Sequence, residues 1–326
     1  MELSKKIYRK SRKIRASIIV AVFNMDSTIK ECIDSLLNEN LKDCEIIVIN
    51  DNSTDKTKRI ISKYKNIKII NEKIRRGIAS TRNVGIKKGK GNIIIFVDAD
   101  CIVQKNSINK LIEFLEKNEQ VVGVSGIAYS YDRNSIIGLS HEARLFEYSI
   151  LDNKAREIKF IATMFSGFRR DVLLKINGFD EELTMACEDA DLSFRCRRYG
   201  KLFIIPDAKV FHHHPTKIFP LWKKWFSYGI GWAQFSKKNH YYKDMIATFM
   251  WMASFFLFFI LAIVFKNLIF FFAGVSLFLA PWLILYFPNT LRYLLRYKKP
   301  QALLFIIPHN IQILARSAGV LMGIFK

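Results

Sequence analysis

Short hydrophobic runs alternate with helical patterns between residues 17 and 210 of this 326-residue chain. A run that is apolar on both faces is typical of a strand buried in a parallel sheet. The expected strands are residues 17–22, 45–50, 67–71, 92–97, 121–129 and about 202–210. The alternation predicts an α/β domain with a mostly parallel sheet and helices on both of its faces.

Two connecting helices can be placed between the first three strands. Ser27 is suited to cap a helix that runs to about Asn38, because its hydroxyl can accept a hydrogen bond from a backbone N–H of the first turn. Residues 53–55, Ser-Thr-Asp, are expected to open a second helix that ends near Tyr64.

The last third of the chain has a different pattern. Residues 246–265 and 268–287 are two stretches without a charged residue, and each is long enough to cross a bilayer as a helix. Only Lys266 and Asn267 separate them, which predicts a transmembrane hairpin. Residues 302–325 are also apolar but contain polar side chains, so the sequence leaves open whether this segment spans the membrane or lies at its interface.

The net charge of +22 predicts an anionic partner. Residues 1–16 form a basic arm without the apolar core of a secretory signal, and either a solvated tail or attraction to anionic headgroups fits it. Residues 216–244 interleave lysines with aromatic residues, a mixture that suits the headgroup layer of a membrane. Because the membrane explains much of the charge, no nucleic-acid partner is expected. The predicted organisation is a basic arm (1–16), an α/β domain (17–215), an interfacial segment (216–244) and a membrane region (245–326).

Basic residues flank the predicted hairpin at both of its ends. They are Lys217, Lys223, Lys224, Lys237, Lys238 and Lys243 before it, and Arg292, Arg296, Lys298 and Lys299 after it. Because cytoplasmic flanks of membrane spans are enriched in Lys and Arg, both ends should face the cytoplasm. The five cysteines form no Cys-x-x-Cys pair, which predicts reduced thiols and no zinc site. We therefore expect a multi-pass protein of the cell membrane whose α/β domain is cytoplasmic.

Polar side chains follow three of the predicted strands. Asn24 follows the first strand, Asp51 the second, and Asp98 and Asp100 the fourth. The carboxyl ends of parallel strands meet at one edge of a sheet, where ligands bind in open α/β folds. If the fourth strand continues, Asp98 and Asp100 point to the same side, and such a pair of carboxylates suits Mg²⁺ or Mn²⁺. The alternative is that these residues only form loops and turns.

A second acidic cluster, Cys-Glu-Asp-Ala-Asp at residues 187–191, begins a helix that ends near Gly200. Acidic residues are common in the first turn because they compensate the helix dipole. Asp189 lies three residues before Leu192 on the predicted buried face, which makes it the better candidate for a general base, with Glu188 beside it. Asp191 lies four residues before Arg195, so an exposed ion pair is expected there.

Three histidines, residues 212–214, follow the last predicted strand. Adjacent side chains diverge, so at most one of them is expected to bind a metal, and His212 is the first after the strand. A structural role fits each of them equally well. Cys101 and Cys187 adjoin the acidic motifs and are interpreted as small apolar fillers.

These elements together resemble the family 2 glycosyltransferases, which have the GT-A nucleotide-sugar-binding fold, a Rossmann-like α/β fold. The matching segments cover residues 17–215 in the family's order. They are SIIVAVFNMDSTIKECIDSLL, EIIVINDNSTDKT, RRGIASTRNVGIKKGKGNIIIFVDAD, FSGFRRDVLLKINGFDEEL, CEDADLSFRCRRYG and PDAKVFHHHP. Two departures exist: Ala-Val-Phe-Asn at 21–24 stands where the family often has Pro-x-Tyr-Asn, and Lys-Lys-Trp at 223–225 only faintly matches the Gln-x-x-Arg-Trp of processive synthases. The second departure weakens any expectation of processive polymer synthesis.

The resemblance implies roles for individual residues. The residues it places at the donor nucleotide sugar are Asn24, Asp51, Arg82, Asp98 and Asp100. It gives the catalytic base to Asp189, with Glu188 beside it. It implies that a divalent cation, Mn²⁺ or Mg²⁺, is bound by Asp100, Asp98 and His212. It places Ser166, Gly167 and Asp191 in the region that binds the acceptor.

The function so implied is a membrane-anchored, inverting glycosyltransferase. It would move a sugar from a nucleoside diphosphate donor to a hydroxyl of a cell-surface glycan or lipid-linked acceptor at the cytoplasmic face. A polyprenyl-phosphate sugar synthase is the alternative within this class. A nucleotidyltransferase and a non-catalytic membrane-surface scaffold are the alternatives from other classes.

Overall fold

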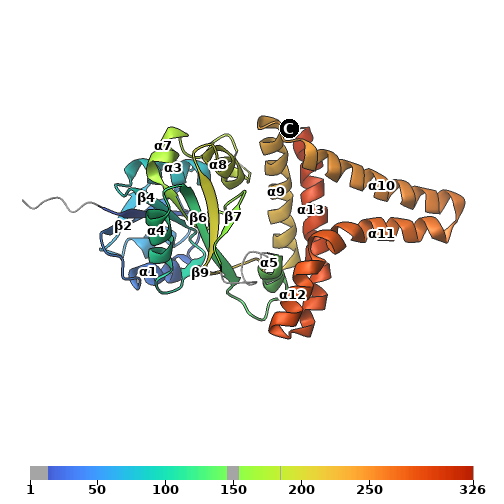
Figure 1. Cartoon of the computed structure of the whole chain (residues 1–326), viewed down its shortest axis with the longest axis horizontal. Helices are drawn as coiled ribbons and strands as arrows, with labels where there is room; N and C mark the ends of the chain where they lie inside the picture. Colours follow the sequence, from blue (N-terminus) through green and yellow to red (C-terminus); the bar gives the residue numbers. More distant parts are fainter. Residues whose placement is uncertain (1–13, 145–153, 184, 326) are drawn as a thin grey trace, which may run out of the picture.

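The structure, a computed structural model, describes residues 14–144, 154–183 and 185–325. Most of the predicted basic arm, residues 1–13, lies outside the described residues. The described chain forms an α/β domain followed by a helical region, and the two are joined by the long helix α9 (Ile218–Lys238) (Figure 1).

Nine strands of the described residues form one sheet, in the order β3-β2-β1-β4-β8-β6-β9-β5, with β7 paired to β9. Their bounds are β1 (Ala16–Val22), β2 (Cys44–Asn50), β3 (Lys68–Asn71), β4 (Ile93–Val97), β5 (Cys101–Val103), β6 (Val121–Ser130), β7 (Arg156–Ile158), β8 (Phe165–Arg169) and β9 (Lys201–His212). All six strands predicted from the sequence are present. The three that the pattern did not predict, β5, β7 and β8, have three to five residues each. The neighbours β3, β2, β1 and β4 run parallel as expected, whereas antiparallel β8 between β4 and β6 makes the whole sheet mixed.

Two hydrophobic cores lie on the two faces of this sheet. The first contains the buried side chains of α1 (Ile29–Leu37) and α4 (Ser107–Lys117). The second contains those of α3 (Ile78–Lys88), α7 (Arg170–Lys175) and α8 (Glu188–Cys196). Alternation along β1 serves both cores, since Ile18 and Val20 belong to the first and Ile19 to the second.

The predicted starts of the first two helices were wrong. Thr28, not Ser27, occupies the N-cap position of α1, and its side chain makes no capping hydrogen bond. The second helix, α2 (Thr57–Ile61), begins two residues later than expected and is short. Its start is displaced because Thr54 and Asp55 bond to the loop after β1 instead.

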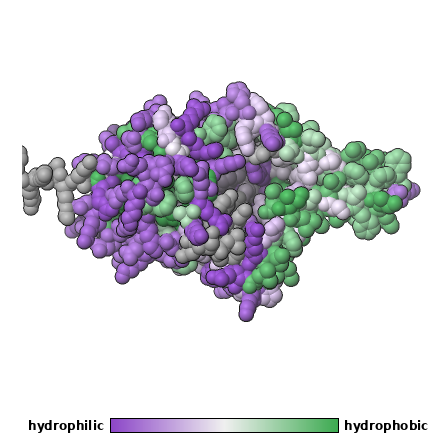
Figure 2. Space-filling model, in the orientation of Figure 1, coloured by the Kyte–Doolittle hydropathy of each residue, from purple (hydrophilic) through white to green (hydrophobic). Residues whose placement is uncertain are grey.

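Beyond the sheet, α9 and α13 run along one side of the domain, α12 lies near α5 (Ile136–Arg144), and the α10–α11 hairpin projects away from the domain (Figure 1). Their bounds are α10 (Lys243–Phe265), α11 (Leu268–Leu285), α12 (Phe287–Tyr297), the 3₁₀ helix η1 (Pro300–Phe305) and α13 (Ile306–Ile324). Three segments of the described residues are long and apolar enough to cross a membrane: Met245–Phe265, Leu268–Leu285 and Pro300–Ile324. Figure 2 shows the hydrophobic surface gathered over the α10–α11 hairpin and the hydrophilic surface over the α/β domain.

The third of these segments differs from the hairpin. Half of its most apolar window is buried inside the protein, against 0% for α10 and 11% for α11. The buried polar side chains of α13 face the rest of the chain: His309 and Gln312 are fully buried, and His309 contacts the carbonyl oxygen of Ser140 at 3.0 Å. In Figure 1, α13 runs beside α9 and across the direction of the hairpin.

Helix α9 packs tightly on both of its sides. A Cβ at Gly229 would lie 2.1 Å from the carbonyl oxygen of Arg316 and 2.8 Å from Cα of Gly319, so glycine lets α9 and α13 touch backbone to backbone. A Cβ at Gly231 would lie 2.4 Å from the carbonyl oxygen of Ala186, in the loop before α8. The helix therefore connects α13 to the loop that carries the second acidic cluster.

The sequence predicted that the aromatic residues of 216–244 lie in the headgroup layer, but some aromatic residues of α9 are buried in the protein instead. Trp225 and Phe235 are buried within the protein, while Phe219 and Trp222 are exposed. Only part of the segment can therefore meet a headgroup layer, because the rest of α9 packs on α8 and α13.

Candidate active site

The tips of β1 and β2 are bound to each other through Asn24. Its Oδ1 accepts a hydrogen bond of 2.8 Å from the backbone N–H of Thr54, and its own backbone N–H donates to Oγ of Ser53 at 3.0 Å. The backbone of Asn24 is left-handed, with φ of 51°, a conformation that asparagine tolerates better than most residues. The predicted meeting of these strand ends at one edge of the sheet is present.

Asp51 is buried at the same edge, with 3% of its surface exposed. Its two carboxylate oxygens accept hydrogen bonds from the backbone N–H groups of Arg76 at 2.8 Å and Gly77 at 2.9 Å. These bonds fix the loop that leads into α3. Each oxygen has a second lone pair, so a ligand can still donate to the carboxylate.

Arg82 joins the two acidic motifs. Its guanidinium is 5% exposed and donates to Oδ1 of Asp98 at 2.7 Å and to Oε1 of Glu188 at 2.8 Å. The residues are 16 and 106 positions away along the chain. The two carboxylates, led by Asp98, raise the pKa of Arg82 against the opposing effect of burial, so its charge is permanent.

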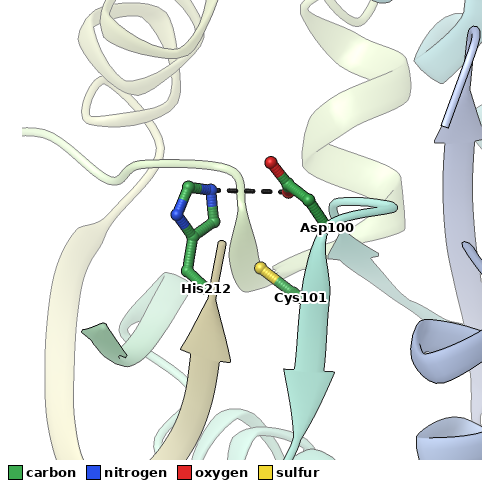
Figure 3. A group of neighbouring side chains, drawn as sticks. All are labelled: Asp100, Cys101 and His212. Atoms are coloured by element: carbon green, nitrogen blue, oxygen red, sulfur yellow. Dashed lines mark ion pairs between the residues drawn. The ribbon is translucent and has the colours of Figure 1, made fainter. Parts of the chain in front are cut away.

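Asp100 lies beside His212 rather than beside Arg82. Antiparallel pairing of Cys101 with His212 brings Oδ1 of Asp100 to 3.4 Å from Nε2 of His212 (Figure 3). Ligand atoms of Asp100, Cys101 and His212 lie within 4.8 Å of one another. Burial lowers the pKa of His212 and so favours the neutral imidazole, which has a lone pair for a metal.

Strand periodicity does not determine the directions of Asp98 and Asp100, because neither residue belongs to a strand. The chain turns directly after β4, with the N–H of Cys101 bonded to the carbonyl oxygen of Asp98 at 3.0 Å. The two-residue periodicity of a strand therefore ends at Val97. Asp98 contacts Arg82 and Asp100 contacts His212, and Asp98 is absent from the cluster of possible metal ligands.

Asp189 sits in the first turn of α8 with its Oδ1 bonded to the backbone N–H of Ala190 at 2.8 Å. Burial, followed by the charge of Glu188, raises the pKa of Asp189 to about 7. A carboxylate with such a pKa exchanges protons readily near neutral pH, as a general base must.

The other predicted site residues lie elsewhere. Asp191 is fully buried, and its Oδ2 is 2.6 Å from the guanidinium of Arg195, so the expectation of an exposed ion pair was wrong. The helix packs Asp191 against Asn239 beyond α9, which covers the side predicted to face solvent. Ser166 and Gly167 are inside the sheet on β8, where Phe96 and Ile95 pair with them. None of the three lines the cavity described next.

A cavity of 270 Å³ opens beside Asp189, between the α/β domain and helices α9 and α13. Its lining includes two cationic side chains, Lys224 and Arg316, and the aromatic side chains of Phe160, Trp225, Tyr228 and Trp232. Sequence reasoning missed this wall. Arg316 within an apolar stretch was the available signal, because an ionisable residue in such a segment usually faces a cavity or a partner.

The geometry unites the strand-tip carboxylates with the helix that carries Glu188 and Asp189. The sequence model described as "Glycosyl transferase family 2" matches residues 17–176. Residues 17–176 belong to glycosyltransferase family 2. The chain as a whole has an α/β sheet of the GT-A type followed by helices able to span a membrane.

The curated proteins that are similar to this chain include two examples. One is the uncharacterized glycosyltransferase EpsJ of Bacillus subtilis, 34% identical over 56% of this chain and 56% of its own. The other is the poly-beta-1,6-N-acetyl-D-glucosamine synthase of Staphylococcus epidermidis, 27% identical over 67% of this chain and 53% of its own. The chain thus spans about half the length of the curated relatives it matches.

Among solved structures, the fold is similar to the mannosyltransferase PcManGT from Pyrobaculum calidifontis, determined in complex with GDP-Man and Mn²⁺. The TM-score is 0.61 at 15% identity, and the match covers 94% of this chain and 87% of that one. At this identity the likeness concerns the fold, including its helical part.

The cluster at Asp100 fits a divalent cation. A carboxylate oxygen and an imidazole nitrogen are ligands that Mn²⁺ accepts, with other positions left to water or a diphosphate. Cys101 is a poor ligand here, since burial raises the pKa of its thiol well above its usual value and a neutral thiol binds metals weakly. The donor set is therefore Asp100 and His212.

Proposed function

We propose that this family 2 glycosyltransferase transfers a sugar, with inversion, from a nucleoside diphosphate sugar to a hydroxyl of a cell-surface glycan or lipid-linked acceptor. The observation that carries the proposal is the pair of contacts made by Arg82. Through them the donor-side carboxylate Asp98 and the base-side residue Glu188 are held on one guanidinium. Arg82 thereby fixes a residue proposed to contact the donor next to a residue beside the proposed base. Such fixed positioning of the reacting partners is the first requirement for a displacement.

The residues divide the chemistry between them. Asp51 binds the nucleoside, and Asp100 and His212 hold the divalent cation, which when bound supplies positive charge to the diphosphate. Asp189 takes the proton of the acceptor hydroxyl. The hydroxyl oxygen forms a bond to the anomeric carbon while the bond from that carbon to the diphosphate oxygen breaks, and the nucleoside diphosphate leaves with the electron pair. Attack opposite to the leaving group inverts the anomeric centre.

The relatives support a nucleotide-sugar donor without identifying it. PcManGT is described with GDP-Man and Mn²⁺, and the Staphylococcus epidermidis relative is a poly-N-acetylglucosamine synthase. We propose a divalent cation, Mn²⁺ or Mg²⁺, as the cofactor of this chain. We also propose attachment to the cell membrane with the α/β domain in the cytoplasm, because basic residues flank the hairpin at both of its ends in the sequence.

The test is transfer by the full-length protein in lipid nanodiscs with a panel of nucleoside diphosphate sugars, Mn²⁺ and a membrane glycolipid extract. We expect release of nucleoside diphosphate, and NMR should show a product whose anomeric configuration is opposite to that of the donor. Asp189→Asn and Asp100→Ala should each abolish transfer, while Asp171→Asn, an exposed carboxylate on α7, should not. Full activity in either of the first two variants would refute the assignment. Release of pyrophosphate instead of nucleoside diphosphate would indicate a nucleotidyltransferase.

A further inference from the structure

The cavity beside Asp189 is lined by two cationic side chains, and binding of a neutral glycan hydroxyl alone would not require them. Its charged lining consists of one carboxylate, Asp189, and two cations, Lys224 on α9 and Arg316 on α13. The guanidinium carbon of Arg316 lies 5.0 Å from the centre of the Trp232 ring, and within the described residues it forms no ion pair with an acidic side chain. A cation held in this way has charge available for a ligand.

The position of Arg316 strengthens this point. It lies in the apolar segment Pro300–Ile324, where a charged side chain is costly unless it serves a partner or a polar cavity. The backbone contact at Gly229 and Gly319 brings this turn of α13 onto α9, directly at the cavity wall.

The cavity wall also contains a buried hydrogen-bond donor. The indole Nε1 of Trp232 is buried and donates to no atom of the described residues. Burying such a donor without an acceptor costs about 1–3 kcal/mol. An oxygen-rich anion would accept this hydrogen bond and would be attracted by the positive charges of Lys224 and Arg316.

We propose that this cavity binds the phosphate or diphosphate of a lipid-linked acceptor, with Lys224 and Arg316 as the residues that recognise it. The inference rests on the proposed function and names its acceptor class. A phosphate is chosen over a carboxylate because its three oxygens match three donors from Lys224, Arg316 and Trp232. A lipid is chosen because Arg316 belongs to an apolar segment, Pro300–Ile324, that is long enough to cross a membrane and that also lines the cavity.

The test uses pairs of probes that differ only in the phosphate: farnesyl phosphate and farnesyl diphosphate against farnesol. Binding to the full-length protein in phosphatidylcholine nanodiscs is followed by tryptophan fluorescence, since two tryptophans line the cavity. We expect the phosphorylated probes to bind at least about tenfold more tightly than farnesol, a difference of about 1.4 kcal/mol.

Two substitutions test the cations, each with a matched control. Arg316→Gln and Lys224→Gln should each raise the Kd for farnesyl phosphate about tenfold, while Arg296→Gln and Lys223→Gln, on exposed positions, should change it less than about twofold. The melting temperature of each variant shows that it is folded, and Arg316→Lys, which keeps the charge, should retain part of the binding. Equal binding of farnesol and farnesyl phosphate, or unchanged binding in both cation variants, would overturn the proposal.

The donor's own diphosphate is the other source of a phosphate. Binding of UDP and GDP with Mn²⁺, and of inorganic diphosphate, is therefore measured on the same variants. Unchanged nucleotide binding in Arg316→Gln supports an acceptor site, whereas an equal loss of nucleotide and farnesyl phosphate assigns the cations to the donor and overturns the inference. Absence of any nucleotide binding in the unmodified protein would instead count against the proposed function.

Discussion

At the scale of single residues, the environment of Asp189 should set the pH dependence of the proposed sugar transfer. Its raised pKa of about 7 means that the carboxyl group is protonated below that pH and cannot accept a proton. We expect kcat/KM to rise about tenfold per pH unit below pH 7 and to level off above it. A pH–rate profile of the full-length protein measures this, and a profile that is flat from pH 5 to 8 would remove Asp189 as the base.

The neighbouring carboxylate offers a sharper form of the same test. Glu188→Gln removes the negative charge that adds to the effect of burial on Asp189, and it leaves Arg82 less compensated. Both changes favour the ionised carboxylate, so the pH profile should shift to lower pH. A residue with a merely structural role would lower the rate without moving the profile.

Arg82 carries the largest local stability effect that we expect. Arg82→Met leaves Asp98 and Glu188 without their shared cation, and removing one partner of a buried ion pair costs about 3 kcal/mol. The variant should melt earlier and bind UDP or GDP more weakly. Arg59→Met, an exposed arginine on α2, is the control and should leave both unchanged.

From the sequence, the edge of the sheet at which the candidate residues lie could be predicted, but the contacts of these residues could not. Asn24, Asp51 and Asp98 were placed at one edge of the sheet because parallel strands align their ends. The contacts of Arg82 were not foreseeable, because no local pattern shows that Glu188 lies 106 residues away at the same guanidinium. Asp98 and Asp100 have different ion-pair partners, Arg82 and His212, which strand periodicity could not show because β4 ends at Val97.

At the scale of elements, long hydrophobic runs predicted the strands and the hairpin, and short elements were missed. Strand β8 was missed because Ser166 and Gly167 interrupt its apolar residues, whereas β4, which has the same length, is a continuous apolar run. Its pairing with β4 and β6 joins residues 41 to 76 positions apart, and only the folded chain reveals it.

The crossing of α9 and α13 yields a prediction about glycine. An alanine in a helix is normally more stable than glycine by about 1 kcal/mol. At Gly229 the added methyl group would meet the backbone of α13, so Gly229→Ala should lower the melting temperature, with an overpacking cost of about 1–3 kcal/mol. Gly274→Ala on α11 is the matched control, because its nearest atom would lie 3.4 Å away, an ordinary contact. Equal melting temperatures for the two variants would contradict the tight crossing.

At the scale of the whole molecule, the direction of the hairpin relates the α/β domain to the membrane that α10 and α11 are proposed to cross. If α10 and α11 span the bilayer, the turn at Lys266 and Asn267 lies on the far side from the α/β domain (Figure 1). In intact cells, Asn267→Cys should react with a membrane-impermeant maleimide, and Lys117→Cys on α4 should react only after lysis. Four of the native cysteines are buried, so background labelling is low. The reverse pattern would place the α/β domain outside the cytoplasm.

The same geometry bears on the segment whose span the sequence left open. Because α13 runs across the hairpin and packs on α9, we propose that it lies along the interface. Cysteines at the exposed positions Ile307 and Met322, at opposite ends of α13, should then both be unreactive from outside. Labelling of one of them in intact cells would show instead that α13 crosses the bilayer.

The contact of Gly231 with Ala186 has a practical consequence. The segment boundary at residue 215 is a boundary of composition and not of packing, since α9 lies directly on the loop before Asp189. A fragment ending at residue 215 would keep the strand tips but would lack the wall that α9 and α13 give to the cavity beside Asp189. Under the proposed function, such a fragment, trimmed for solubility, should retain the residues proposed to bind the nucleotide and yet transfer no sugar.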